Sequence, residues 1–179
     1  MTEHYLKAII LDRSSWGNQD VLLTLYTKEL GKIRASSKSM RKITSKLSGQ
    51  LPIGSLATVR LVDNGYLRLV DALKEEQFDL TDDTIKHLYF LDEVIPFNQP
   101  DRDLWYTIYE ILRSGVITPR IYGHLLGLMG FIPQEGQLIC QGCRANKVVY
   151  FDPRDIMFLC TNCSERGISD IEKYIKISD

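Results

Sequence analysis

The sequence has no apolar run that approaches the roughly 20 residues needed for a membrane-spanning helix. Its N-terminus also lacks a basic segment followed by an apolar stretch and a small-residue cleavage site, so we expect a cytoplasmic protein. Catalytic signatures such as G-x-S-x-G, H-E-x-x-H and the phosphate-binding G-x-x-x-x-G-K-[ST] are missing as well. These absences argue against an enzyme.

The net charge of −1 does not by itself indicate a nucleic-acid partner, but the charges are unevenly distributed. Basic residues dominate between residues 28 and 46, whereas acidic residues outnumber basic ones between residues 71 and 110. The bases of the first stretch are Lys28, Lys32, Arg34, Lys38, Arg41, Lys42 and Lys46. This pattern is compatible with two surfaces that meet different partners, and equally with ordinary solvated faces.

Short segments rich in apolar residues predict five β-strands, at residues 5–13, 20–27, 32–37, 55–62 and 66–73. Asn64-Gly65 is a hairpin signal because both residues tolerate positive φ, and Leu67 and Leu69 should then face inward. The Ser-, Lys- and Arg-rich residues 36–50 predict a mobile loop. Five short strands with one long interruption fit a small barrel such as the OB-fold, although the pattern does not exclude an SH3-like barrel.

Beyond Phe78 the apolar period changes from two to about 3.6, which predicts helices. The first helix begins after Thr81, ends before Pro96 and places an apolar stripe on one face. This stripe consists of Ile85, Leu88, Leu91 and Ile95. Further helices are expected after Asp101 and after Thr118. The fold class is therefore α+β, with an OB-type barrel domain at residues 1–78 and a helical domain at residues 79–179.

All four cysteines lie in one window, as Cys140-x-x-Cys143 and Cys160-x-x-Cys163. Two thiolates three residues apart on a turn can occupy adjacent corners of a tetrahedron, and a second such turn supplies the other two, at about 2.3 Å from the ion. The pattern predicts one zinc ion in a module at about residues 138–166. Disulfides fit a reducing compartment poorly, and an iron–sulfur cluster fits the paired spacing less well than zinc. Four thiolates leave no open coordination position, so the site should be structural.

Several segments, taken in order, resemble the RecO family of bacterial recombination mediators. The matching stretches are residues 8–13, 17–20, 23–33, 41–51 and 124–133, followed by the two cysteine pairs. The chain departs from the family's pattern by having less helical sequence between Phe78 and Thr118. It also has Arg144 where a glycine is common, and Met157-Phe-Leu159 where a glycine pair often occurs.

The resemblance implies a DNA-repair mediator that binds single- and double-stranded DNA and anneals complementary strands. It also implies that the protein works with RecR and single-strand-binding protein to load RecA at gaps, associated with the bacterial nucleoid. The alternative is a zinc-stabilised protein-interaction adaptor with little DNA affinity, in which the acidic residues 71–110 form the docking face.

For a DNA-binding mediator we expect six of the basic residues of the first stretch to contact phosphates, together with two on the barrel surface. These residues are Lys32, Arg34, Lys38, Arg41, Lys42, Lys46, Arg60 and Arg68. Trp16 and Tyr66 are candidates to stack on unpaired bases, with packing at the barrel rim as the alternative. Residues Cys140, Cys143, Cys160 and Cys163 are the expected zinc ligands.

Overall fold

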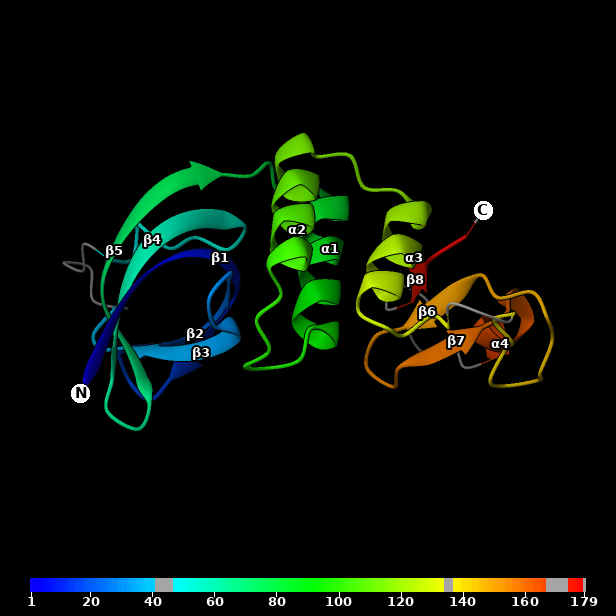
Figure 1. The fold of residues 1–179 in the computed structure, drawn as a ribbon, viewed down its shortest axis with the longest axis horizontal. Coiled ribbons are helices and arrows are strands. Elements are labelled where there is room, and N and C mark those ends of the chain that lie inside the picture. Colours follow the sequence, from blue (N-terminus) through cyan, green and yellow to red (C-terminus); the bar gives the residue numbers. More distant parts are fainter. Residues whose placement is uncertain (41–46, 134–136, 167–173, 179) are drawn as a thin grey trace. The chain divides into compact units, whose positions relative to one another are not determined.

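The computed structural model describes residues 1–40, 47–133, 137–166 and 174–178. The chain forms two compact units, residues 1–115 and residues 116–179, which we treat separately (Figure 1). The α+β class expected from the sequence is confirmed. The described residues contain no helix with both the length and the apolar composition needed to traverse a lipid bilayer.

The first unit contains five strands and two helices in chain order. They are β1 (Thr2–Trp16), β2 (Asp20–Thr27), β3 (Gly31–Ser37), β4 (Ser55–Asp63), β5 (Leu67–Gln77), α1 (Asp82–Val94) and α2 (Arg102–Ser114). All five predicted strands are present, although β1 extends three residues beyond each predicted end and β5 extends four residues beyond its predicted C-terminal end. The predicted hairpin is also present, with Gly65 at φ 99° and its N–H donating to Asp63 Oδ1 over 2.9 Å.

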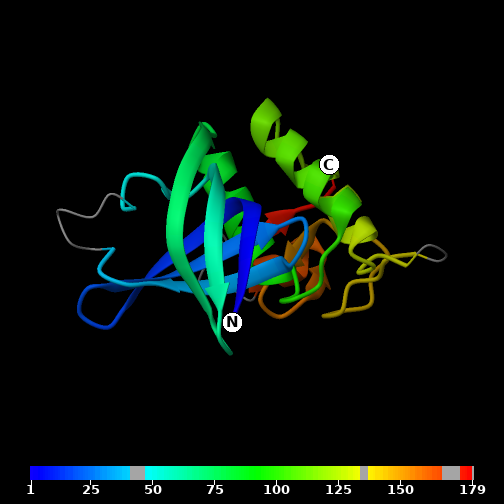
Figure 2. The ribbon, with the colours of Figure 1, turned by 60° about the vertical axis from the view of Figure 1, so that its left-hand side comes forward.

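The five strands close into a barrel in the order β1-β2-β3-β5-β4 (Figure 2). Closure depends on the length of β1, whose first half pairs with β4 and whose second half pairs with β2. The β1–β2 register shifts between Ile10 and Asp12, where the strand passes from one partner to the other. A parallel contact between Ser36 of β3 and Arg68 of β5 joins the two sides of the barrel.

Alternate residues of the strands fill the barrel interior, as the period-two pattern requires. The buried members are Leu6, Ala8, Ile10, Val21, Leu23, Leu25, Ile33, Ala35, Met40, Leu51, Ala57, Val59, Leu61 and Leu69. Met40 and Leu51 are both buried in this core, and residues 41–46 of the segment predicted to be a mobile loop lie outside the described residues. Leu69 is buried and Leu67 packs against this core, as predicted.

Helix α1 begins where predicted, with Thr81 accepting a hydrogen bond from Thr84 N–H over 3.2 Å. The predicted apolar stripe is wrong at Ile85, which is 54% exposed, whereas Thr84 and His87 are buried. Thr84 tolerates burial because its hydroxyl lies 3.0 Å from that of Thr81 and forms a hydrogen bond with it.

The compact units divide near residue 115, and not at the predicted boundary of residue 78. Helix α1 packs against β1, and the segment after α1 is bonded to β3 through Asn98 N–H, which donates to the Lys32 carbonyl over 2.9 Å. Both helices therefore belong with the barrel. The apolar pattern reveals helices but does not reveal which neighbour covers their buried faces.

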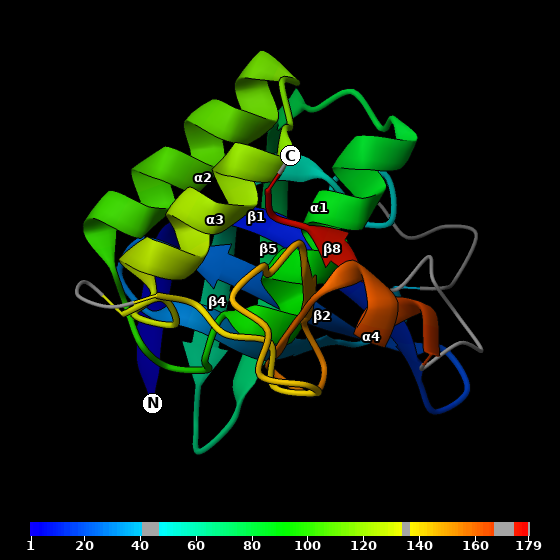
Figure 3. The same ribbon diagram turned by 90° about the vertical axis from the view of Figure 1, so that its right-hand side faces the viewer.

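The second unit contains α3 (Pro119–Leu128), β6 (Tyr150–Asp152), β7 (Met157–Leu159), α4 (Thr161–Arg166) and β8 (Ile175–Lys176) (Figure 3). The three short strands form a sheet in the order β7-β6-β8, and α3 contacts β8. Phe151 and Phe158 pack with ring centroids 5.0 Å apart, on the paired strands β6 and β7. This small hairpin carries the second cysteine pair at its end.

Candidate nucleic-acid face and metal centre

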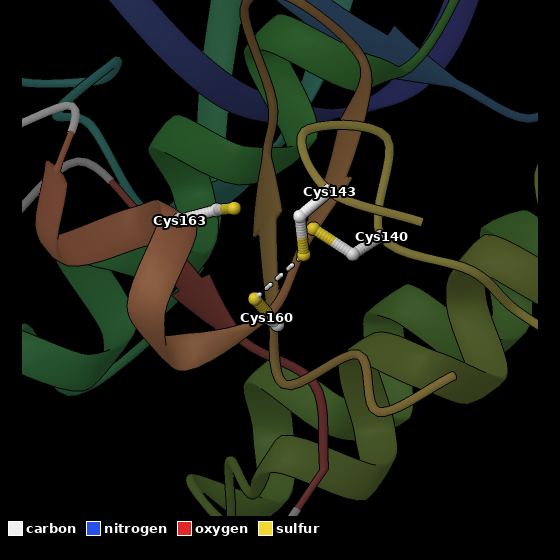
Figure 4. Close-up of side chains that lie close together, drawn as sticks. All are labelled: Cys140, Cys143, Cys160 and Cys163. Atoms are coloured by element: carbon white, nitrogen blue, oxygen red, sulfur yellow. Dashed lines mark hydrogen bonds between the residues drawn. The ribbon is translucent and has the colours of Figure 1, made fainter. Parts of the chain in front are cut away.

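The four cysteine side chains converge on one point in the second unit (Figure 4). All their Sγ atoms lie within 4.8 Å of one another, and those of Cys143 and Cys160 are 3.6 Å apart. A tetrahedral ion with bonds of about 2.3 Å requires sulfur atoms about 3.8 Å apart. The cluster can therefore hold one metal ion, with small movements of the side chains.

Backbone hydrogen bonds shape both cysteine turns. Arg144 N–H donates to the Cys140 carbonyl over 2.7 Å, and Cys163 N–H donates to the Cys160 carbonyl over 3.1 Å. Gly142 lies against the second turn, where an added Cβ would come 3.0 Å from the Cys163 Sγ. A side chain at this position would therefore enter the space of the ligand sulfur.

The first turn is fixed to the β6–β7 hairpin by Gln141. Its N–H donates to the Phe158 carbonyl over 2.9 Å, and its Oε1 accepts from Phe158 N–H over 2.6 Å. Cys160 directly follows β7, and Cys163 lies on α4. The hairpin thus holds the two turns face to face, which the spacing of the cysteines along the chain could not reveal.

The thiols have strongly different acidities. Burial acts to raise the pKa of Cys140, but hydrogen bonds from the backbone of Cys160, Cys143 and Gly142 outweigh it and bring the pKa to about 6. Hydrogen bonds with the other three cysteines, first Cys143, raise the pKa of Cys163 to about 12. Because one thiolate opposes the ionisation of the next, four thiolates coexist only around a cation. The donor set therefore fits a metal ion.

Three of the basic residues predicted to bind DNA surround Ser36 on the outside of the barrel. They are Arg34, Lys38 and Arg68, and we call them the cationic face. Arg34 and Lys38 lie two residues to either side of Ser36, and Arg68 is its partner on β5. Their strand neighbours Ile33, Ala35 and Leu69 are buried in the barrel, so the three basic side chains point outward.

The cationic face keeps its charges available. Ion pairs form elsewhere on the described part of the first unit, and none of them involves one of these three basic residues. Arg34 and Lys38 are exposed and Arg68 is half-buried. Arg34 and Lys38 are separated by four residues of extended chain, which corresponds to about 13 Å.

Lys32 does not fit its predicted role as a phosphate contact. Its exposed fraction is 2%, its ammonium donates to the backbone carbonyl of Asp92, and it lies 4.3 Å from the ring centroid of Phe97. Burial lowers the pKa of this lysine, and the nearby Asp92 carboxylate acts in the opposite direction. Its charge therefore faces the end of α1, and not the solvent.

Arg60 lies outside the cationic face and is already paired. Its Nη2 and Nε donate to the two carboxylate oxygens of Glu3, over 2.8 and 3.1 Å. The guanidinium also lies 5.7 Å from the ring centroid of Tyr5. Three other basic residues that were predicted to bind DNA, Arg41, Lys42 and Lys46, lie outside the described residues.

One predicted stacking residue lies at the end of a strand and the other on a hairpin loop, and both are largely exposed. Trp16, at the end of β1, is 58% exposed, and Tyr66, on the β4–β5 hairpin, is 57% exposed. Neither is packed into the barrel rim, which was the alternative. Sequence reasoning missed a third exposed aromatic, Phe97, because it lies in a linker with no repeating pattern; it is 39% exposed and lies beside Arg34.

The fold and its sites define a two-unit protein, in which a small closed β-barrel carries a cationic face and a second unit holds a four-thiol metal-binding cluster. Residues 1–74, which include nearly all of the barrel, match the family model for the recombination protein O N-terminal domain. Several proteins named DNA repair protein RecO are similar to most of the chain. These similarities agree with the resemblance to the RecO family that the sequence indicated.

Three of these relatives illustrate the degree of similarity. The protein from Dehalococcoides mccartyi strain 195 is 26% identical over 191 residues, covering 96% of this chain and 75% of the relative. The Caldicellulosiruptor saccharolyticus protein is 28% identical over 181 residues, covering 92% and 74%. The Bacillus subtilis strain 168 protein is 25% identical over 177 residues, covering 89% and 68%.

Proposed function

We propose that this chain is a DNA-repair mediator that grips single- and double-stranded DNA through the cationic face of its barrel. The observation that carries the proposal is the arrangement of Arg34, Lys38 and Arg68 around Ser36, with no ion pair to a described acid. Basic side chains without an acidic partner are available to neutralise phosphates, which releases the counterions bound to the DNA. The similarity of the chain to proteins named DNA repair protein RecO supports the same role.

We infer that the barrel is of the OB type. A five-stranded barrel with β1 paired to both β2 and β4, and with a β3–β5 contact, supports this assignment. OB-folds bind oligonucleotides on the face of strands 2 and 3 and on the loops between strands 1 and 2 and strands 4 and 5. Arg34 lies on β3 and Lys38 directly after it, Trp16 ends β1 beside the first of these loops, and Tyr66 lies in the second loop, next to the start of β5 that carries Arg68.

Strand annealing needs no side-chain chemistry on this account. Charge neutralisation lowers the repulsion between two strands, and contacts that ignore the base sequence let bases search for partners. The protein is therefore not an enzyme. By the family resemblance, its partners are RecR and single-strand-binding protein, and its action leads to the loading of RecA.

In the second unit we propose that the four cysteines hold one zinc ion. Four sulfur ligands leave no open position, so the ion stabilises the fold and takes no part in a reaction. The residues that would hold it are Cys140, Cys143, Cys160 and Cys163. Such a site contributes on the order of 10 kcal/mol of binding free energy in small zinc modules, which compensates for the short strands around it.

The test compares DNA binding and strand annealing by three forms of the full chain. The first is wild type, and the second carries Arg34→Gln, Lys38→Gln and Arg68→Gln. The third is a matched control that also loses three positive charges, through Lys74→Gln, Lys86→Gln and Arg113→Gln. We expect the second form to bind a fluorescent single-stranded oligonucleotide at least about tenfold more weakly and to anneal strands more slowly. Equal losses in both variants would contradict the proposal.

A specific observation favours the adaptor as a second candidate. Lys32 is buried and Arg60 is paired with Glu3, so two of the predicted DNA contacts are committed within the protein. In the adaptor, the acidic residues 71–110 dock a protein partner. Pull-down with RecR or with the single-strand-binding protein tail separates the two candidates, because an adaptor captures its partner equally well with and without DNA.

A further inference from the structure

Phe97 lies beside the cationic face but belongs to the segment between α1 and α2. It forms an isolated parallel bridge with Lys32, at the end of β3 away from the β5 contact. The Arg34 guanidinium lies 4.8 Å from the centroid of its ring, and the ring is 39% exposed. An accessible aromatic surface thus adjoins a guanidinium that has no carboxylate partner among the described residues.

The segment that carries Phe97 is firmly held. Asn98 N–H donates to the Lys32 carbonyl, and the buried Lys32 ammonium lies 4.3 Å from the ring centroid. The backbone also passes so close to β3 that a Cβ on Gly31 would come 2.4 Å from the Gln99 carbonyl oxygen. Pro96 and Pro100 further restrict the backbone on either side. A ring fixed in this way loses little conformational freedom when a ligand stacks on it.

The outer face of β2 and β3 offers no such platform nearby. Tyr26, which pairs with Lys32 across β2 and β3, is fully buried, so β2 and β3 themselves present no exposed aromatic there. The segment between α1 and α2 instead places the aromatic ring of Phe97 beside Lys32 of β3. Bases stack on aromatic rings without sequence preference, because every base has a π-face.

We propose that Phe97 is a base-stacking platform for single-stranded nucleic acid, working together with Arg34. The inference rests on the proposed function, since it assumes that the cationic face binds the backbone. An unpaired base stacks on the exposed part of the ring, and the Arg34 guanidinium beside it meets the adjoining phosphate. A duplex, whose bases are already stacked, gains nothing from Phe97, so this residue favours single strands over double strands.

The experiment uses the full chain, a single-stranded oligonucleotide of thymidines and an abasic strand with the same number of phosphates. Phe97→Leu keeps an apolar side chain next to Lys32 but removes the ring. We expect this variant to bind the thymidine strand about tenfold more weakly and the abasic strand as tightly as wild type. The conservative Phe97→Tyr variant should stay within about twofold of wild type on both ligands, since it keeps the aromatic ring.

Two results overturn the inference. One is an equal loss on both ligands, which would mean that Phe97 only supports Lys32 and Arg34, and the other is unchanged affinity for the thymidine strand. Thermal unfolding of each variant shows whether a loss comes from the fold. If wild type binds neither strand at low salt, the proposed function fails. If wild type binds the thymidine strand and the Phe97→Leu variant binds it equally well, only the role of Phe97 fails.

Discussion

The ammonium of Lys32 on β3 donates a hydrogen bond to the backbone carbonyl of Asp92 in the last turn of α1. That turn contains no basic residue of its own. Because the C-terminal end of a helix carries a partial negative charge and unsatisfied carbonyls, a cation placed there is stabilising. A lysine that the charge pattern assigned to DNA therefore fastens the helix to the barrel.

Replacing Lys32 with Met should lower the free energy of unfolding by about 1–2 kcal/mol, because the carbonyl of Asp92 loses its charged partner. Urea unfolding followed by circular dichroism measures the change. The matched control is Lys28→Met, since Lys28 is partly exposed just after β2 and makes only long contacts, 3.8 Å to Glu29 and 5.6 Å to the centroid of the Tyr106 ring. If both variants lose the same stability, Lys32 does not act as a helix cap.

His87 makes the first unit sensitive to acid. Burial lowers its pKa from 6.5 to about 4, so folding favours the neutral imidazole. A group with a depressed folded pKa binds more protons when unfolded, and stability is therefore lost as the pH falls from about 6.5 towards 4. The loss attributable to this residue approaches about 3 kcal/mol at the lower end of this range.

The measurement is the unfolding free energy of wild type and of His87→Gln between pH 7 and pH 4. The substitution itself will reduce stability at every pH, so the slope is the informative quantity. We expect a shallower decline in the variant, because its side chain does not titrate. Parallel curves would show that other groups cause the acid sensitivity.

Gly142 should be indispensable to the metal centre. In Gly142→Ala the new methyl group would come 3.0 Å from the Cys163 sulfur, so we expect weaker metal binding and a less stable second unit. Competition with a chromogenic zinc chelator measures the affinity. Gly127→Ala is the control, because an added Cβ there has no neighbour within 4 Å. Equal affinities in the two variants would show that the cluster adapts to the extra methyl group.

Local features of the fold were predictable from the sequence, whereas features that depend on long-range contacts were not. The alternation of apolar residues located five strands, and Asn64-Gly65 located the hairpin, because these signals act between near neighbours. The cysteine spacing located the metal cluster for the same reason. The compact units divide near residue 115 and not at the predicted residue 78, because the contacts between α1 and the barrel, such as Lys32 with Asp92, join residues far apart in the chain.

The charge pattern predicted the cationic face only in part. It drew attention to the basic residues between residues 28 and 46, but a basic residue in a strand can point outward, as Arg34 does, or meet a helix end, as Lys32 does. The ion pair of Arg60 with Glu3 could not be predicted, because Glu3 lies 57 residues away along the chain. Arg60 was therefore predicted to contact DNA. Phe97 carried no signal, since its position beside Arg34 depends on how the segment after α1 crosses β3.

The most direct test of the central claim is the salt dependence of single-strand affinity. Each phosphate contact contributes about 0.7 to the slope of log affinity against log salt concentration, so three contacts contribute about 2. The variant with Arg34→Gln, Lys38→Gln and Arg68→Gln should show a slope shallower than that of wild type by about this amount. The substitution Arg60→Gln should leave the slope unchanged, because this guanidinium is held by Glu3. An unaltered slope in the triple variant would contradict a DNA-binding role for the cationic face.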